Sequence, residues 1–276
     1  MTTSAPATDR YELGLEVLRQ VSGPSGPAVL AGLDDIAPDL ARMTAEFAYG
    51  DIYARPGLTL AQRQIATVAA LTALGNAAPQ LRFHIDAALT LGLTPAEIVE
   101  VIIHTSVYAG FPAALNGLTA ARAAFAARPD LDSTPAPGTH HPEETSRQRY
   151  ERGLTQLARI DGRAGDAVIR SLSDIAPDLG RYIVEFAFAD VYSREGLNLR
   201  DRELATIAAC TALGTAGPQL RVHLHGLLNV GGTRTQAVET IIQMAVYAGF
   251  PAALNGIAAA REVFTERDTT GVTDPA

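Results

Sequence analysis

The chain has 276 residues, 47% of them hydrophobic, and its 30 acidic residues against 22 basic ones give a formal net charge of -8. Such an acidic chain is not expected to bind nucleic acid or an anionic membrane surface, since both attract a basic protein face. All 22 basic residues are arginine, and the absence of lysine excludes Schiff-base, pyridoxal-phosphate and P-loop chemistry.

The N-terminus and the hydropathy pattern give no sign of targeting to a membrane. The opening residues MTTSAPATDR lack the basic start and apolar run of a secretory signal, and no uninterrupted apolar stretch reaches the roughly 18 residues of a membrane helix. The single cysteine, Cys210, allows neither an intrachain disulfide nor a CxxC redox pair. We therefore expect a soluble, cytoplasmic protein with no membrane partner.

Each half of the chain carries one copy of a repeated unit. Residues 10–128 align with residues 149–267 at one constant offset without a gap, and 65 of the 119 paired positions are identical. The sequence VYAGFPAALNG, for instance, begins at Val107 and again at Val246. The segment between the copies is rich in proline, serine, threonine and charge, which is typical of a linker. We predict two domains, 9–128 and 149–267, joined by a linker over 129–148.

Both copies show helical periodicity and no convincing strand alternation, which predicts an all-α fold. In the first copy we expect helices over 9–21, 38–53, 60–74, 79–92, 95–108 and 111–128. Pro38 suits the first turn of its helix because the missing N–H leaves nothing unpaired there. Thr59 with Gln62, and Thr94 with Glu97, match the capping box that begins a helix. The second copy repeats this plan at matching positions.

The ordered motifs of each copy resemble those of the carboxymuconolactone decarboxylase family, within the larger group that includes AhpD-type alkylhydroperoxidases. In the first copy these motifs are GDIYARPGL, Arg63, PQLRFH, Gly92, TPAEIVEVI and VYAGFPAALNG. The resemblance covers nearly all of each repeat. It implies a helical domain that assembles through helix pairing, commonly as hexamers of single domains. A tandem chain would then form a homo-oligomer, in that case a trimer.

The chain departs from the peroxidase branch of this group in its cysteines. The peroxidases carry a CxxC pair upstream of the histidine that matches His84, where this chain reads Ala77-Ala78-Pro79-Gln80. Residues 215–219 also lack sulfur. Disulfide-cycling peroxidase activity is excluded, because it needs two thiols. We expect Cys210 to be a small buried apolar residue.

The decarboxylase branch implies chemistry without a cofactor. In its reference substrate the departing carboxylate is conjugated through a double bond to a lactone carbonyl, so the electrons left by CO2 delocalise into a dienolate. The protein must hold the acid, stabilise the oxyanion and deliver a proton to carbon. We expect a lyase acting on a small carboxylated lactone or enolisable acid, with no cofactor and no metal.

Histidine is the first choice for the proton transfer, because the unperturbed pKa of imidazole lies near neutral pH. His84 and His223 occupy matching positions in the two copies. Each follows a glutamine, Gln80 or Gln219, by four residues, so the amide and the ring share one helical face. The amide is expected to orient the ring or to hydrogen-bond an oxyanion. A hydrogen-bonded packing role for both histidines is the alternative.

Arginines and tyrosines at matching positions are the candidates for substrate binding. The arginines are expected to clamp a carboxylate, with ion pairs to Glu46, Asp51, Glu185 and Asp190 as the alternative. The tyrosines, which lie near helix ends, can donate hydrogen bonds into a pocket or simply pack. The candidates are Arg55, Arg63, Arg194, Arg202, Tyr53, Tyr108, Tyr192 and Tyr247. For Glu100 and Glu239, a solvated position or structural pairing is favoured over a functional role.

The copies differ where a site would be tuned, since Gln243 matches His104 and His225 matches Asp86. One repeat can therefore have lost activity while keeping a role in assembly. His223 and His225 are two residues apart on a helix and cannot form a metal pair on one face.

Two alternatives to a decarboxylase stay open. One is an isomerase, dehydratase or cyclase for an enolisable metabolite, and the other is a non-catalytic helical module that binds a ligand or supports an assembly.

Overall fold

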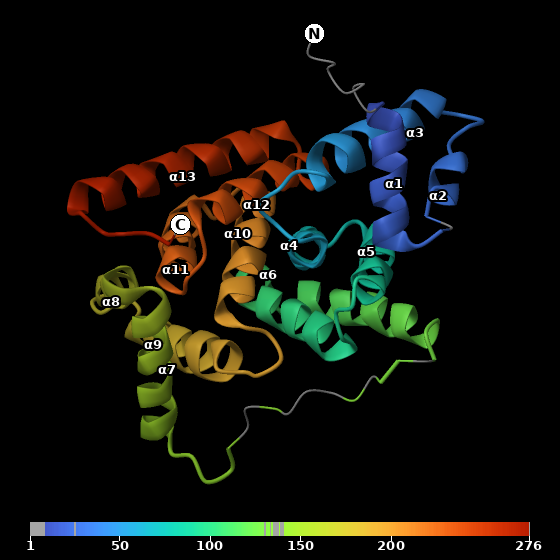
Figure 1. The fold of residues 1–276 in the computed structure, drawn as a ribbon. Coiled ribbons are helices and arrows are strands. Elements are labelled where there is room, and N and C mark those ends of the chain that lie inside the picture. Colours follow the sequence, from blue (N-terminus) through green and yellow to red (C-terminus); the bar gives the residue numbers. More distant parts are fainter. Residues whose placement is uncertain are drawn as a thin grey trace.

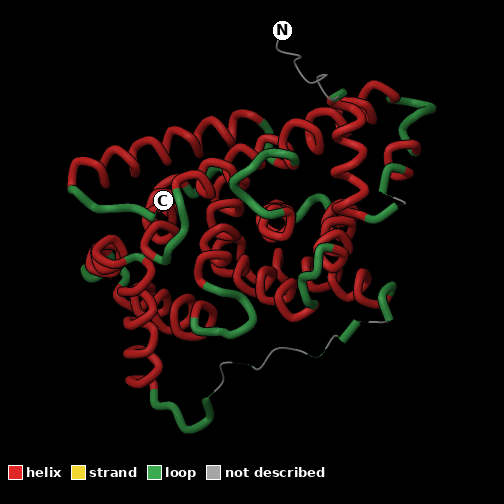
Figure 2. The backbone as a smooth tube through the Cα atoms, in the orientation of Figure 1, coloured by secondary structure: helices red, strands yellow, loops and turns green. Residues whose placement is uncertain are grey.

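A computed structural model describes residues 9–24, 26–129, 131–132, 134, 138 and 141–275, except for the side chain of Arg163; the expected linker 129–148 lies partly outside them. Helices joined by loops make up this described part of the chain (Figure 1), and Figure 2 shows no strand in it. The all-α prediction is confirmed.

The two repeats follow the same order of helices. The first contains α1 (Arg10–Ser22), α2 (Ala28–Ala31), α3 (Pro38–Met43), η1 (Thr44–Tyr53), α4 (Leu60–Leu74), α5 (Ala78–Thr90) and α6 (Pro95–Ala126). The second contains α7 (Ser146–Ile160), α8 (Gly162–Ser171), α9 (Pro177–Tyr182), η2 (Ile183–Tyr192), α10 (Leu199–Leu213), α11 (Gly217–Asn229), α12 (Arg234–Tyr247) and α13 (Phe250–Thr270).

The capping boxes predicted from the sequence are present at the starts of their helices. Thr59 and Gln62 form both hydrogen bonds of a capping box at the start of α4, and Thr94 and Glu97 do the same for α6. The helix that begins at Pro95 bends at Gly110, where φ is 83°, before it continues to Ala126. A positive φ of this kind favours glycine, because a side chain would clash with the backbone.

The expected regular helix over 38–53 is wrong in its second half. After one and a half turns α3 gives way to the π-helix η1, and α9 gives way to η2 in the same manner. Wide π turns are rare and often accompany functional sites. Here α1 crosses η1 so closely that a Cβ on Gly14 would lie 1.9 Å from the carbonyl oxygen of Ala45. The wide turns end at Tyr53 and Tyr192, two of the candidate residues.

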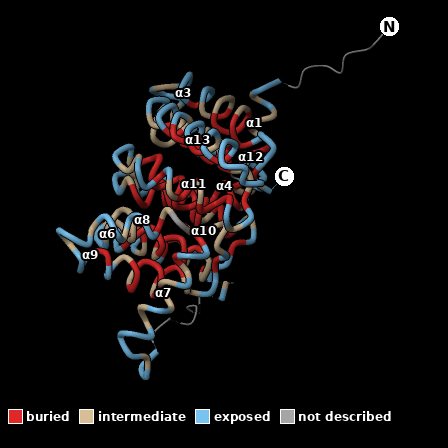
Figure 3. Tube along the Cα trace, turned by 90° about the vertical axis from the view of Figure 1, so that its left-hand side faces the viewer, coloured by how far each residue is buried: buried red, intermediate tan, exposed pale blue. Residues whose placement is uncertain are grey.

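Helices α4 and α10 pack against each other at the centre of the molecule (Figure 1). Alanines line their contact, with Ala66 and Ala70 on one helix and Ala208 and Ala212 on the other. Small side chains let two helix axes approach closely. Figure 3 shows the buried residues gathered around these central helices and the exposed ones along the outer turns.

The hydrophobic cores of the two repeats are shared. Leu197 and Ala205 from the second repeat belong to the core around α4, α5 and α6, while Leu58 from the first repeat belongs to the core around α10 and α11. The repeats are therefore interlocked across the α4 and α10 contact, which brings residues of one repeat to the histidine of the other.

One helix of the described chain, α6, is long and apolar enough to span a membrane by length and composition. In this structure 44% of its most apolar window is buried, and the helix packs against α4, α5 and α10. Its buried side chains, among them Ile98, Val101 and Ile102, belong to the shared core.

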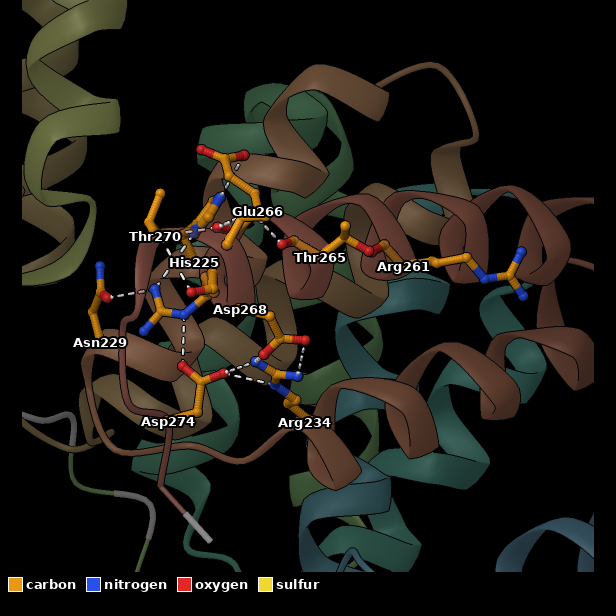
Figure 4. A network of polar contacts seen from close by, with 11 residues as sticks. His225, Asn229, Arg234, Arg261, Thr265, Glu266, Asp268, Thr270 and Asp274 are labelled. Carbon is orange, nitrogen blue, oxygen red and sulfur yellow. Dashed lines mark hydrogen bonds and ion pairs between the residues drawn. The ribbon is translucent and has the colours of Figure 1, made fainter.

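A polar network fastens the C-terminal segment to the second repeat (Figure 4). Asp274 accepts hydrogen bonds from Nε of Arg234, at the start of α12, and from Nε of Arg267 on α13, both at 2.6 Å. Arg267 also donates to Asn229 at the end of α11. His225 lies beside this network, near Arg267 and Glu266, and not beside His223. We therefore interpret it as a structural residue.

Candidate functional site

Two cavities related by the repeat contain the candidate histidines. The cavity at His223 has a volume of about 270 Å³ and the cavity at His84 about 680 Å³. Each is lined by both repeats, since Tyr108 from α6 reaches His223 and Tyr247 from α12 reaches His84. The interlocked repeats thus build two composite sites rather than two independent ones.

His223 belongs to a closed ring of hydrogen bonds. Its Nδ1 lies 3.0 Å from Oε2 of Glu203, and its Nε2 lies 3.1 Å from the hydroxyl of Tyr108. The Tyr108 hydroxyl lies 2.7 Å from that of Tyr192, which donates to Oε1 of Glu203 at 2.6 Å. With an imidazolium and a carboxylate, every N–H and O–H of this ring has an acceptor. The arrangement therefore favours a charged His223.

The pKa values around His223 agree with this assignment of protons. Burial alone would lower the pKa of His223, but the carboxylates of Glu203 and Asp161 outweigh it and raise that pKa to about 9. Burial also raises the pKa of Asp161 to about 7. Its Oδ1 lies 3.9 Å from Nδ1 of His223 and has no hydrogen-bond partner among the described residues. A carboxyl group that titrates near neutral pH thus lines the same cavity.

His84 has neutral neighbours in place of these carboxylates. Its Nδ1 lies 2.9 Å from Oε1 of Gln64, and its Nε2 lies 3.3 Å from the hydroxyl of Tyr247. Tyr247 in turn contacts the Tyr53 hydroxyl at 2.6 Å, and Tyr53 contacts Thr67. Burial lowers the pKa of His84 to about 3, so this imidazole is uncharged at neutral pH.

Three matching positions create the contrast between the sites. Glu203 in the second site corresponds to Gln64 in the first, and Asp161 corresponds to Ser22. The third pair is His104, whose Nε2 lies 2.7 Å from Thr206 beside Tyr192, and Gln243. Each difference replaces a titratable side chain at the His223 site by an uncharged one at the His84 site.

The structure does not bring the four candidate arginines to either cavity. Arg63 and Arg202 are fully buried and pair with Glu239 and Glu100 of the opposite repeat, at 3.0 and 2.9 Å. Arg55 and Arg194 bind the same two carboxylates from outside. These guanidinium groups are therefore paired with carboxylates and join the two repeats. Glu100 and Glu239 are buried and paired, so of the two expectations for them the structural pairing is found and the solvated position is not.

The carboxylates named as alternative arginine partners have other partners. Arg10 binds Asp51, Arg149 binds Asp190, Arg42 binds Glu46, and Arg181 binds Glu185. The remaining candidates are near the histidines. Gln80, His84 and Tyr247 line the first cavity, and Gln219, His223, Tyr108 and Tyr192 line the second, while Tyr53 lies buried behind His84.

Sequence reasoning missed the side chains that set the charge of each histidine. Glu203 and Gln64 lie on α10 and α4, 20 residues before the histidine that they contact, so helical spacing alone does not link them. The signal was available in the alignment of the copies, where a Glu opposite a Gln and an Asp opposite a Ser change the charge at matching positions. The amide that contacts the ring of His84 is that of Gln64, whereas Gln80 was expected to orient this ring.

The described part of the chain offers no evident site for metal binding or for thiol chemistry. No group of three or more His, Cys, Asp or Glu side chains is arranged there to hold a metal ion. Cys210 is buried, and burial raises the pKa of its thiol to about 12, as expected for a packing residue.

Comparison with known proteins agrees with the repeat and with the fold. A family model described as the carboxymuconolactone decarboxylase family matches residues 38–123 and again residues 177–262. The 4-carboxymuconolactone decarboxylase of Acinetobacter baylyi is 38% identical over 117 residues, which cover 42% of this chain and 87% of that protein. That match is about as long as one repeat.

Two further relatives are more distant. Peroxisomal protein 2 of Saccharomyces cerevisiae is 29% identical over 55% of this chain and 60% of its own length. A nitrosuccinic acid decarboxylase of Metarhizium robertsii is 32% identical over 28% of this chain and 52% of its own length. Two of these three relatives are named as decarboxylases, and the family model matches both copies of the repeat. The chain belongs to the carboxymuconolactone decarboxylase family.

Proposed function

We propose that the chain is a cofactor-independent decarboxylase and that its reaction takes place in the His223 cavity. The observation that carries this proposal is the Glu203–His223 pair, which keeps an imidazolium at the wall of a small cavity. A general acid of this kind can protonate a carbanion. The names of two relatives support the reaction class.

The substrate that fits this chemistry is a small carboxylated lactone or enolisable acid. Its C–COO⁻ bond breaks, CO2 leaves, and the bonding electrons move into the conjugated carbonyl to give a dienolate. The imidazolium of His223 then gives a proton to carbon and regains one from solvent, so one proton is consumed for each CO2 released. Glu203 holds the ring in place and stabilises its charged form.

The lining of the cavity supports loss of a carboxylate. No arginine lies among the described residues that line it, and its walls include Leu157, Val168, Ile169 and Phe188. Apart from the imidazolium of His223, a substrate carboxylate against these apolar walls has few compensating contacts, and its charge is dispersed as CO2 departs. Gln219 at the cavity supplies an amide that can hydrogen-bond the developing oxyanion.

The direct test is to incubate the protein with 4-carboxymuconolactone and to measure CO2 release. We expect turnover by the wild-type chain and a loss at least about a hundredfold larger for His223→Gln than for His84→Gln. Equal losses in the two variants would contradict the assignment to one cavity. Intact substrate with wild-type protein would remove this reaction.

The same assay separates the other functions. A product of unchanged mass, or one lighter by water, from an enolisable acid would indicate an isomerase, dehydratase or cyclase. Retained biological activity in a chain carrying both histidine substitutions would indicate a non-catalytic module. The cytoplasmic location stays a prediction, since one relative is named as a peroxisomal protein.

A further inference from the structure

The cavity at His84 differs from its counterpart in more than the histidine's partner. Its volume of about 680 Å³ is more than twice that of the His223 cavity. None of the described residues that line it is an aspartate, a glutamate or an arginine. The corresponding lining of the His223 cavity includes Asp161 and a charged imidazole. The first cavity therefore offers a ligand no formal charge.

Aromatic side chains form much of the wall of the His84 cavity. Phe47, Phe83 and Phe250 line it together with Leu30 and Met43. Phe83 stands edge-on to the His84 ring at 5.1 Å between centroids, where the second repeat has Val222. Rings in these positions favour a flat, apolar guest, because aromatic pairs gain contact area and edge-to-face attraction.

The polar groups at the His84 cavity are uncharged. Gln80, His84 and Tyr247 supply an amide, an imidazole and a hydroxyl to its lining. Behind the histidine, the fully buried Gln64 has an amide nitrogen without a hydrogen-bond partner among the described residues. This set can hydrogen-bond a hydroxyl or carbonyl group. It cannot compensate a buried carboxylate, whose transfer from water without a counterion is costly.

We propose that the His84 cavity is a second small-molecule site, which binds an uncharged, mainly aromatic molecule carrying one hydroxyl or carbonyl group. His84 is expected to hydrogen-bond the ligand rather than to act as a general acid, because no carboxylate holds a proton on its imidazole. Its specificity thus differs from that proposed for the His223 cavity, whose lining carries a charged imidazole. This assignment does not depend on which acid the other cavity takes.

The repeat supplies matched variants for a test. Val246 lines the His84 cavity and Val107 lines the His223 cavity at the corresponding position, and both are half-buried. A tryptophan at either position projects into its own cavity and obstructs part of it, and it leaves the other lining unchanged. Binding is measured by isothermal titration calorimetry with 2-naphthol and with 2-naphthoate, which have the same ring system but differ in charge at pH 7.

We expect the full-length protein to bind 2-naphthol at least about tenfold more tightly than 2-naphthoate at the site that Val246→Trp removes. Val107→Trp should leave that binding within about twofold of the wild type. Naphthol binding that is lost in Val107→Trp and kept in Val246→Trp would overturn the proposal. Absence of naphthol binding, or equal affinity for naphthoate at this site, would also overturn it.

A crystal structure of the wild-type protein grown with 2-naphthol gives a readout that does not depend on the folding of any variant. Density beside His84, Phe83 and Tyr247 is expected. Naphthol found only beside His223, or in neither cavity, would contradict the assignment.

Discussion

Glu203 and Gln64 occupy the same position in the two repeats, and each contacts Nδ1 of its own histidine, at 3.0 and 2.9 Å. The geometry is preserved while the charge is not. A carboxylate stabilises the imidazolium, whereas an amide gives it no such support in a buried setting. This one pair of residues therefore divides a symmetric scaffold into a charged site and a neutral one.

Exchanging Glu203 and Gln64 for each other's side chain should shift the pKa values of the two histidines in opposite directions. We expect Glu203→Gln to lower the pKa of His223 and to reduce CO2 release by about a hundredfold or more, because the general acid is lost. Gln64→Glu should raise the pKa of His84. Imidazole NMR signals report both pKa values, and a His223 pKa unchanged in Glu203→Gln would show that the carboxylate does not hold its proton.

The two histidines should make opposite contributions to stability as pH changes. The pKa of His223 is raised from 6.5 to about 9, so its stabilising contribution is present below pH 6.5 and is lost as pH rises through 9. The pKa of His84 is lowered from 6.5 to about 3, so its contribution is present above pH 6.5 and is lost as pH falls through 3.

Denaturant unfolding at a series of pH values checks both signs. His223→Gln should flatten the alkaline side of the stability profile, and His84→Gln should flatten the acid side. The reverse pattern would mean that the charge states of the two rings are misassigned.

Gly226 leaves room for the Glu203 carboxylate beside it. A Cβ at this glycine would lie 2.8 Å from Oε2 of Glu203. We expect Gly226→Ala to displace the carboxylate from His223, to lower the pKa of His223 and to lower turnover about tenfold or more. Stability should fall as well, because the displaced carboxylate no longer stabilises the imidazolium. Ala87→Gly at the matching position is the control. Equal turnover in Gly226→Ala and wild type would contradict this positioning.

Much of the fold, but only part of the site, could be predicted from the sequence. The capping boxes at Thr59 and Thr94 and the break at Gly110 are local signals, and the structure confirms them. The π turns ending at Tyr53 and Tyr192 were missed because close crossing of helices, not local propensity, accompanies them. The arginine partners were missed because Glu100 and Glu239 come from the opposite repeat, a contact that only the interlocked packing creates.

The buried pair of Arg202 and Glu100 should be important for stability rather than for catalysis. Both side chains have no exposed surface and join the two repeats at 2.9 Å. Glu100→Gln leaves a buried guanidinium without its counterion, and we expect a loss of about 3–5 kcal/mol in the free energy of unfolding. Asp51→Asn, at the more exposed pair with Arg10, should cost much less. Similar losses in the two variants would contradict the structural role assigned to the arginine.

Exposed apolar residues recur at matching positions of the repeats and lead us to propose that copies of the chain associate. Ile36 and Ile175 are 81% and 82% exposed, and Leu115 and Leu254 are 62% and 68% exposed. Large apolar side chains exposed in this repeated way are typical of surfaces that another subunit covers. We expect light scattering to give about three times the 29.0 kDa chain mass. Leu115→Glu combined with Leu254→Glu should lower that mass, because charges would have to be buried at the contact. A monomer at micromolar concentration in the wild type would contradict the proposed association, and an unchanged mass in the double variant would exclude Leu115 and Leu254 from the contact.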